Sequence, residues 1–236
     1  MAEPDHMVHQ HRDVQGGAAR AAVFGISDGL VSNVALILGV AAASVDASTV
    51  MLAGVSGLLA GAASMAAGEY VSVKAQAELI ERELVIERAS LEERPQLEVA
   101  ELAAIYRARG IDARQAREKA PAVMADIDVA LDVHAREELG VDPSEVGNPV
   151  AAAGASFVAF AVGAALPLVP WLIGSGTAAI VASVVIGLVA AAAVGATLAR
   201  YTERSVARTV FRQVGLAAAA CVLTWLIGSA LGASVV

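Results

Sequence analysis

The chain has 236 residues, of which 57% are hydrophobic and 17% are charged, and its mean hydropathy is +0.66. Soluble globular domains carry about 45–50% apolar and about 25% charged residues, so this composition excludes an ordinary water-soluble monomer and a disordered chain. The net charge of −8 argues against nucleic-acid binding, and a single cysteine, Cys221, excludes a disulfide framework. We therefore expect a polytopic membrane protein.

Residues 1–20 form a polar N-terminal tail without the apolar core of a signal peptide. Five apolar stretches follow that are long enough to cross a bilayer, since about 20 helical residues at a 1.5 Å rise span roughly 30 Å. They cover residues 22–44, 50–73, 150–171, 177–199 and 209–231. Pro167, Pro170 and the glycines at 174–176 divide the charge-free run into the third and fourth spans. The sequence thus predicts an all-α integral membrane protein with five transmembrane helices.

The charges are concentrated between the second and third spans. Residues 74–146 hold 10 Lys+Arg and 17 Asp+Glu, whereas 21–73 and 147–236 carry the spans. Within this acidic segment we expect a helix continuing to Pro95, one over 97–109, a short one near 112–119, and one that Pro121 opens and Gly140 ends.

Orientation follows from the arginines in short loops, which stay in the cytoplasm. Arg12 and Arg20 precede the first span, and four arginines cluster where span four ends and span five begins, whereas loops 45–49 and 172–176 contain none. The N-terminus and the acidic segment are therefore predicted to be cytoplasmic and the C-terminus external, in the inner cell membrane.

Carboxylates of the acidic segment share the apolar faces of its predicted helices. Glu87 falls on the stripe of Ile80, Leu84 and Leu91, and similar spacing places Glu98 and Glu101 on the next helix and His134 and Glu138 on the last. Burying unpaired carboxylates costs several kcal/mol each, so a shared Fe(II), Mn(II), Co(II) or Zn(II) ion would explain their convergence. The alternative is a solvated acidic face. Its arginine partners would be Arg82, Arg88, Arg94 and Arg136.

Three polar or polarisable side chains lie at a similar depth in the first two spans. Asp28 is about six residues inside span one, whereas Met65 and Glu69 are one helical turn apart near the cytoplasmic end of span two. Carboxylates within a membrane are costly and usually face a cavity or a pathway. Alternatively, Asp28 caps a helix, Glu69 is an interfacial anchor and Met65 fills a packing gap.

Enzymatic function is not expected. The serine of Gly54-Val55-Ser56-Gly57 resembles a nucleophile, but every histidine lies outside the spans, so no base is available to activate it. No phosphate-binding GxxxxGK[ST] loop occurs, which argues against direct use of ATP. The histidine cluster of the tail, His6, His9 and His11, is either a loose metal site or part of a disordered end.

Four segments resemble motifs of the vacuolar iron transporter family, in the family's order. They are Phe24-Gly25-Ile26-Ser27-Asp28-Gly29-Leu30, residues 64–72 (SMAAGEYVS), residues 101–106 (ELAAIY) and residues 134–140 (HAREELG). The resemblance covers nearly the whole chain after about residue 18. It implies a homodimer in the lipid bilayer, with cytoplasmic helices that bind divalent metal and an antiporter's proton-coupled export of Fe(II) from the cytosol. No organic cofactor is implied.

The resemblance also assigns residues. Asp28 and Met65 match pathway positions, and Glu69 is the third pathway candidate. By the resemblance, Glu87, Glu98, Glu101 and Glu138 look like metal ligands, and His134 and Glu137 are further candidate ligands. This chain has Ser90 where the family often has an acid, and His134-Ala135 where some members have two methionines. A membrane-anchored metal-binding or signalling module without transport is the alternative function.

Overall fold

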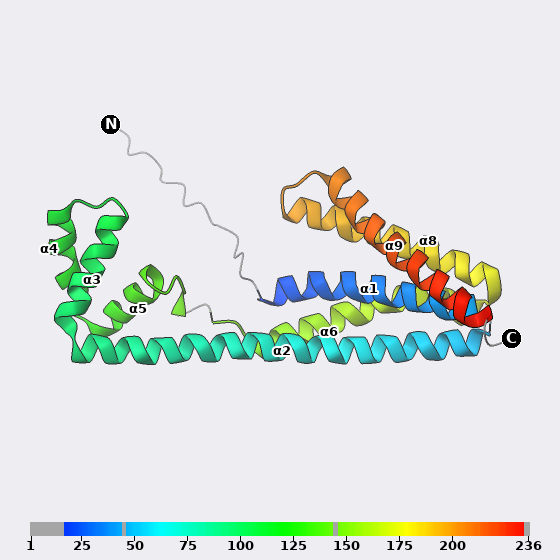
Figure 1. Cartoon of the computed structure of the whole chain (residues 1–236), viewed down its shortest axis with the longest axis horizontal. Helices are drawn as coiled ribbons and strands as arrows, with labels where there is room; N and C mark the ends of the chain where they lie inside the picture. Colours follow the sequence, from blue (N-terminus) through cyan, green and yellow to red (C-terminus); the bar gives the residue numbers. More distant parts are fainter. Residues whose placement is uncertain (1–16, 44–45, 144–145, 234–236) are drawn as a thin grey trace, which may run out of the picture. The chain divides into compact units, whose positions relative to one another are not determined.

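The computed structural model of the chain describes residues 17–43, 46–143 and 146–233, and within these ranges its regular structure is helical (Figure 1). The histidine cluster of the tail lies outside the described residues. The α-helices are α1 Gly17–Ala43, α2 Ala47–Glu93, α3 Pro95–Ala108, α4 Ala113–Val123, α5 Ile127–Glu137, α6 Pro149–Ala165, α7 Val169–Ile173, α8 Gly176–Tyr201 and α9 Val206–Ala233. A 3-10 turn, η2 Leu166–Leu168, joins α6 to α7.

Five of these helical segments are long and apolar enough to cross a membrane. They are Ala18–Ala43, Ala47–Glu93, Pro149–Ile173, Gly176–Tyr201 and Val206–Gly232, so the five-span, all-α prediction is confirmed. Pro167 lies in η2, and the third span bends through this turn instead of ending there, because α7 resumes at Val169. The third span ends at Ile173, and Gly176, whose φ of 64° is positive, is the first residue of the fourth.

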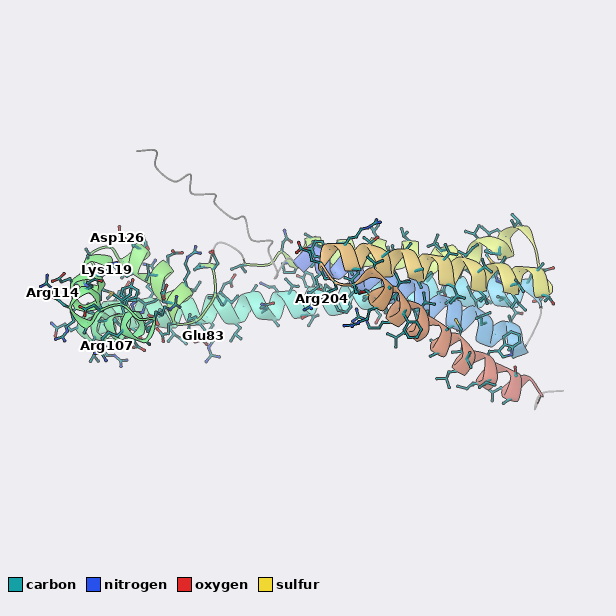
Figure 2. All side chains as sticks on the ribbon, turned by 90° about the horizontal axis from the view of Figure 1, so that it is seen from above. Glu83, Arg107, Arg114, Lys119, Asp126 and Arg204 are labelled. Atoms are coloured by element: carbon teal, nitrogen blue, oxygen red, sulfur yellow. The ribbon has the colours of Figure 1, made fainter. Side chains whose placement is uncertain are left out.

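Contacts divide the chain into two compact units. The first, which we call the apolar unit, holds residues up to Tyr70 and from Pro149 onward, and the second, the acidic unit, is Val71–Asn148. Helix α2 contributes its first half to one and its last half to the other. Figure 2 labels charged side chains of the acidic unit, among them Glu83 and Lys119, and Arg204 in the turn between α8 and α9.

Helix α1 is the centre of the apolar unit and packs against α6, α8 and α9. Its contact with α6 is backbone against backbone: a methyl group on Gly29 would lie 2.2 Å from the carbonyl oxygen of Phe160, and one on Gly163 would lie 2.3 Å from that of Ile26. In a bilayer the hydrophobic effect does not drive helices together, so they associate through close packing at small residues of this kind. Only glycine fits at Gly29 and Gly163.

Helix α2 joins this unit through side chains instead. Asp46 accepts the N–H of Thr49 at 2.9 Å and caps the helix start. Farther along, a methyl group on Gly54, Gly57 or Gly61 would meet the side chains of Leu168, Leu36 and Phe160, respectively. Buried Val50 and Ala62 belong to two small apolar clusters with residues of α1, α6 and α7. One face of α2 is therefore packed and the rest of it is open.

In the acidic unit, α3 and α4 pack together over a core of Leu102, Ala103, Ala116 and Ala120. The expected helix start at Pro121 is wrong. Helix α4 continues through Pro121 to Val123, and α5 starts at Ile127 because the Asp126 carboxylate accepts the N–H groups of Asp128 and Val129. The first turn of a helix has free N–H groups, which the Asp126 carboxylate can accept and a proline side chain cannot. Asp126 therefore determines where α5 starts.

Candidate metal sites

The acidic unit gathers three candidate ligands from two helices. Glu87 lies on the last part of α2, His134 on α5, and Glu138 is the C-cap residue of α5. One ligand atom from each lies within 4.8 Å of the other two. We call these three residues the acidic site. Glu87 and His134 come from segments 47 residues apart, so the fold and not the local sequence creates the site.

The acidic site is buried at its centre. The His134 side chain is 0% exposed and that of Glu87 is 10% exposed, whereas Glu138 reaches the surface at 34%. Nδ1 of His134 lies 2.9 Å from Oε1 of Glu87 and 3.5 Å from Oε2 of Glu138. This arrangement presents one imidazole nitrogen to two carboxylate oxygens.

Despite these short distances, hydrogen bonding within the acidic site is incomplete. Among the described residues, neither ring nitrogen of His134 nor Oε1 of Glu87 has a hydrogen-bond partner of acceptable geometry. A buried polar group without a partner costs about 1–3 kcal/mol. Imidazole nitrogen and carboxylate oxygen are also the donors that bind first-row divalent metals. The buried, unsatisfied atoms therefore fit a divalent cation.

Electrostatics identify further carboxylates around Glu87. Burial raises the pKa of Glu87 above its ordinary value, the charge of Glu138 raises it further, and His134 opposes both. The charges of Glu98 and Glu101 on α3 also raise this pKa. Glu98 is 8% exposed, whereas Glu101 is on the surface. Four carboxylates thus act on one buried site, and a cation there would compensate their repulsion.

Glu137 is held differently. Its Oε2 lies 2.7 Å from Nη1 of Arg109, and its charge raises the pKa of Tyr106 after the larger effect of burial. It is the next residue to Glu138 on the chain, but adjacent helical residues point in different directions. The structure pairs Glu137 with an arginine and does not group it with His134.

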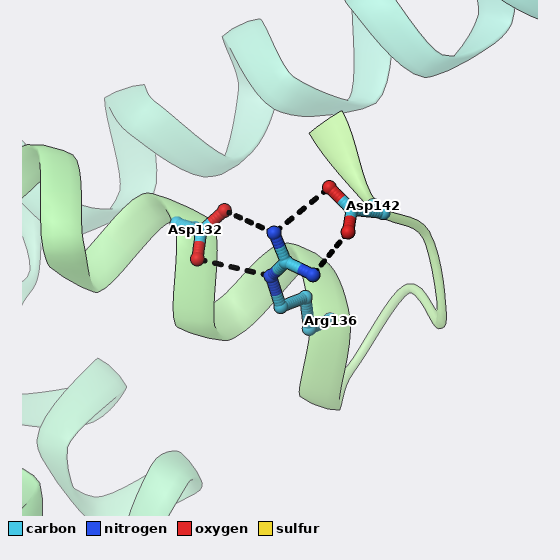
Figure 3. A network of polar contacts seen from close by, with 3 residues as sticks. All are labelled: Asp132, Arg136 and Asp142. Carbon is cyan, nitrogen blue, oxygen red and sulfur yellow. Dashed lines mark hydrogen bonds and ion pairs between the residues drawn. The ribbon is translucent and has the colours of Figure 1, made fainter. Parts of the chain in front are cut away.

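Two of the four arginines that a solvated acidic face would use, Arg88 and Arg136, pair with other residues. Arg88 pairs with Asp128, and Arg136 forms a network with Asp132 and Asp142 in which Nε lies 3.0 Å from an oxygen of Asp132 and Nη2 lies 2.8 Å from one of Asp142 (Figure 3). In the described part of the chain, none of the ion pairs joins an arginine to Glu87, Glu98, Glu101 or Glu138. The network holds the end of α5, where Glu138 is located.

A second candidate site lies within the apolar unit. A pocket of about 330 Å³ is lined by residues of α1, α2 and α6, including Asp28, Asn33, Ser64, Met65 and Phe160, and we call it the Asp28 pocket. Asp28 and Met65, which the sequence placed at a similar depth, line the same cavity. Asp28 is exposed at its edge and Met65 is half-buried. The pocket therefore offers a carboxylate and a thioether to one ion.

Glu69 is not among the residues that line this pocket. Its Oε1 lies 2.8 Å from Nη2 of Arg20 on α1, with 17% of the Glu69 side chain exposed. The pair connects the N-terminal part of α1 to α2 one turn from Met65. Glu69 is therefore neutralised by a cation of the protein.

Of the residues that line the Asp28 pocket, the sequence singled out Asp28 and Met65 as site residues, and two of those it did not single out are Asn33 and Phe160. Asn33 is 2% exposed, and Phe160 of α6 forms part of the wall. An amide in the middle of an apolar span was a usable signal, because such groups are costly in lipid and usually have a partner. Phe160 gave no signal, since its position follows only from the packing of α6 on α1.

Comparisons with known proteins agree with this arrangement. Residues 19–229 match the model of the VIT family. A protein named vacuolar iron transporter from Acanthamoeba castellanii is 39% identical over 161 residues, which make up 67% of this chain and 58% of that protein. Vacuolar iron transporter 1 of Arabidopsis thaliana is 31% identical over 217 residues, 92% of this chain and 86% of that protein. The chain belongs to the VIT family.

Proposed function

We propose that the protein is a divalent metal transporter that exports Fe(II) from the cytosol in exchange for protons, with Mn(II), Co(II) and Zn(II) as further candidate substrates. The observation that carries the proposal is the Asp28 pocket, where a carboxylate and a thioether face one cavity between membrane-spanning helices. Relatives named vacuolar iron transporters support iron as the substrate. The carboxylate attracts the cation, and a carboxylate can also exchange protons.

The acidic site has a separate part in this proposal. Glu87, His134 and Glu138, with Glu98 and Glu101 beside them, would collect metal from the cytosol and supply it to the pathway. Glu137 is the least favoured ligand, because its carboxylate is paired with Arg109. The arginines outside the acidic unit support a cytoplasmic N-terminus and acidic unit and an external C-terminus in the cell's inner membrane.

A homodimer is part of the same proposal. Asp28 is exposed in an apolar helix, and an uncovered carboxylate in lipid is costly. Only 17% of the apolar window of α2 and 11% of that of α9 are buried within one chain. A second copy of the chain that covers the open side of α1 and α2 would enclose Asp28 and Met65 between two subunits. Glu69 and Arg20 would lie near the cytoplasmic end of that pathway.

The test is reconstitution of the full chain in sealed vesicles with a metal-sensitive dye inside and an imposed pH gradient. We expect Fe(II) flux that requires the gradient and disappears when an ionophore collapses it. Parallel runs with Mn(II), Co(II) and Zn(II) rank the substrates. Metal binding without flux would instead identify a membrane-anchored metal-binding or signalling module. Flux that is independent of the pH gradient would exclude proton coupling.

A further inference from the structure

The Asp28 pocket contains a buried amide that the family resemblance does not assign. Asn33 lies on α1 five residues beyond Asp28 and lines the same cavity, yet it is only 2% exposed. A neutral amide at this depth is expected to have all of its polar atoms satisfied. The amide of Asn33 meets this expectation at one end only.

The nitrogen end of this amide is fixed by α6. Nδ2 of Asn33 donates a hydrogen bond of 2.6 Å to the carbonyl oxygen of Ala164. Ala164 lies in the last turn of α6, just before η2, where helical carbonyls lack regular intrahelical partners. The bond therefore caps the break in the third span and determines which way the amide points.

The oxygen end has no partner. Oδ1 of Asn33 is buried and accepts no hydrogen bond from the described residues. It faces α2 at Gly57, where an added methyl group would lie 3.1 Å from it, and Gly57 itself lines the pocket. An unsatisfied buried acceptor is unfavourable by about 1–3 kcal/mol. Such an oxygen, held in position and directed toward a cation pathway, is suited to a cation.

We infer that Oδ1 of Asn33 is a further ligand of the transported ion and determines specificity together with the carboxylate of Asp28 and the thioether of Met65. This inference rests on the proposed function. A carboxylate, an amide oxygen and a thioether form a mixed set that favours a borderline divalent transition metal. Mg²⁺ and Ca²⁺ prefer oxygen ligands throughout, so the thioether selects against them.

The neutral charge of the amide also matters for release. With Asp28 as its one carboxylate among the described lining residues, the pocket leaves a divalent cation partly uncompensated. Transport requires a site that binds well enough to be entered and weakly enough to be left. Asn33 adds a ligand without adding a charge, so the ion is selected without being trapped.

Two substitutions at this position test the inference in opposite directions. Asn33→Leu keeps the volume and removes the oxygen, and we expect the KM for Fe(II) flux into vesicles to rise roughly 10- to 100-fold. Asn33→Asp keeps an oxygen and adds a charge, so the KM for Fe(II) should fall while the maximal rate falls as well. If Asn33 only caps Ala164, both variants lose the amide donor and their KM values move in the same direction, which would overturn the inference.

Ser156→Ala is the matched control. Ser156 on α6 is also fully buried, and its hydroxyl also lacks a partner, but it contacts α1 near Gly25 and does not line the pocket. We expect its KM for Fe(II) to equal that of the unmodified protein. A rise equal to that of Asn33→Leu would show that the effect comes from packing of α1 on α6, and would contradict a ligand role.

An equilibrium measurement separates this inference from the proposed function. In the full chain carrying Glu87→Gln, His134→Gln and Glu138→Gln, the remaining binding of Co(II) is titrated by its visible absorption in detergent. We expect one weak site that Asn33→Leu weakens about tenfold or more and Ser156→Ala leaves unchanged. Binding with this dependence but no flux would refute transport and support the ligand role of Asn33. Flux with no effect of Asn33→Leu on binding or KM would refute the ligand role of Asn33 and support transport.

Discussion

The two candidate sites both contain carboxylates but differ in how many they have and in the ligands beside them. The acidic site brings several carboxylates around one buried imidazole, and burial together with their repulsion raises the pKa of Glu87. The Asp28 pocket has one carboxylate with a thioether and an amide in an apolar wall. Many charges favour capture and retention of a cation, whereas one charge favours passage. In the proposed function, this difference in charge assigns retention of the metal to the acidic site and its passage to the Asp28 pocket.

The largest effect should come from the single carboxylate of the Asp28 pocket. Asp28→Asn keeps the size of the side chain and removes its charge, so we expect Fe(II) flux in vesicles to fall roughly 100-fold. Metal binding at the acidic site should not change, as measured by calorimetry on the full chain. Flux at the unmodified rate would show that Asp28 only caps a helix.

The next effect concerns Glu87. Glu87→Gln removes a ligand atom from the centre of the acidic site, so metal affinity of the full chain should fall by about 100-fold. Transport should slow without stopping, because the Asp28 pocket remains intact. Calorimetry and vesicle flux measure the two quantities separately. An unchanged affinity would support the solvated acidic face.

Although Glu87→Gln should weaken metal binding, it should stabilise the metal-free protein at neutral pH. The pKa of Glu87 is raised from its ordinary value of 4.5, so the folded state holds this proton more tightly than the unfolded state does. The resulting stability is present below that value and is lost as pH rises through the raised pKa. Glu87→Gln should therefore slow amide hydrogen exchange in α5 at neutral pH and have little effect in acid. Faster exchange at neutral pH would contradict this prediction.

A smaller change is expected from the carboxylates that surround the acidic site. Glu98→Gln with Glu101→Gln should lower metal affinity about tenfold, because these side chains act on Glu87 through their charge. Glu137→Gln is the matched control, since Glu137 is paired with Arg109. An equal loss in the control would show that Glu137 is a ligand as well.

Met65→Leu tests the contribution of the thioether to the Asp28 pocket. It conserves volume and removes only the sulfur, so we expect a roughly threefold loss of Fe(II) flux and a smaller loss for Mn(II), which prefers oxygen. The ratio of the two fluxes is the quantity to measure. A uniform loss for both metals would indicate a packing role for Met65.

A similarly small effect is expected at Glu69. Its pairing with Arg20 is partly exposed to solvent, and such pairs contribute about 0.2–1 kcal/mol. Glu69→Gln should therefore change Fe(II) flux by less than about fivefold. A loss comparable to that of Asp28→Asn would place Glu69 directly on the route of the ion.

The spans could be predicted because hydropathy and length alone define a membrane helix. The boundary near 174–176 was predicted from its glycines, whereas Pro167 and Pro170 lie inside the third span. The start of α5 could not, since two capping candidates, Pro121 and Asp126, compete and only the observed hydrogen bonds decide between them. Side-chain spacing identified Glu87 and His134. The same spacing placed Glu138 beside His134 and left out Glu137, whose carboxylate the structure pairs with Arg109. The position of the Asn33 amide in the pocket could not be predicted, because it depends on the hydrogen bond to Ala164 at the end of α6.

The glycine contacts have a mechanical consequence for the Asp28 pocket. Its α1–α6 wall is locked, because at Gly29 and Gly163 each helix rests on the other's carbonyl oxygens and neither can slide without a collision. Along α2 the contacts at Gly57 and Gly61 are made by the ends of Leu36 and Phe160, which can rotate. The pocket thus has a rigid side, formed by α1 and α6, and a side that can move, formed by α2. We expect a hydrated ion to be admitted by displacement of α2.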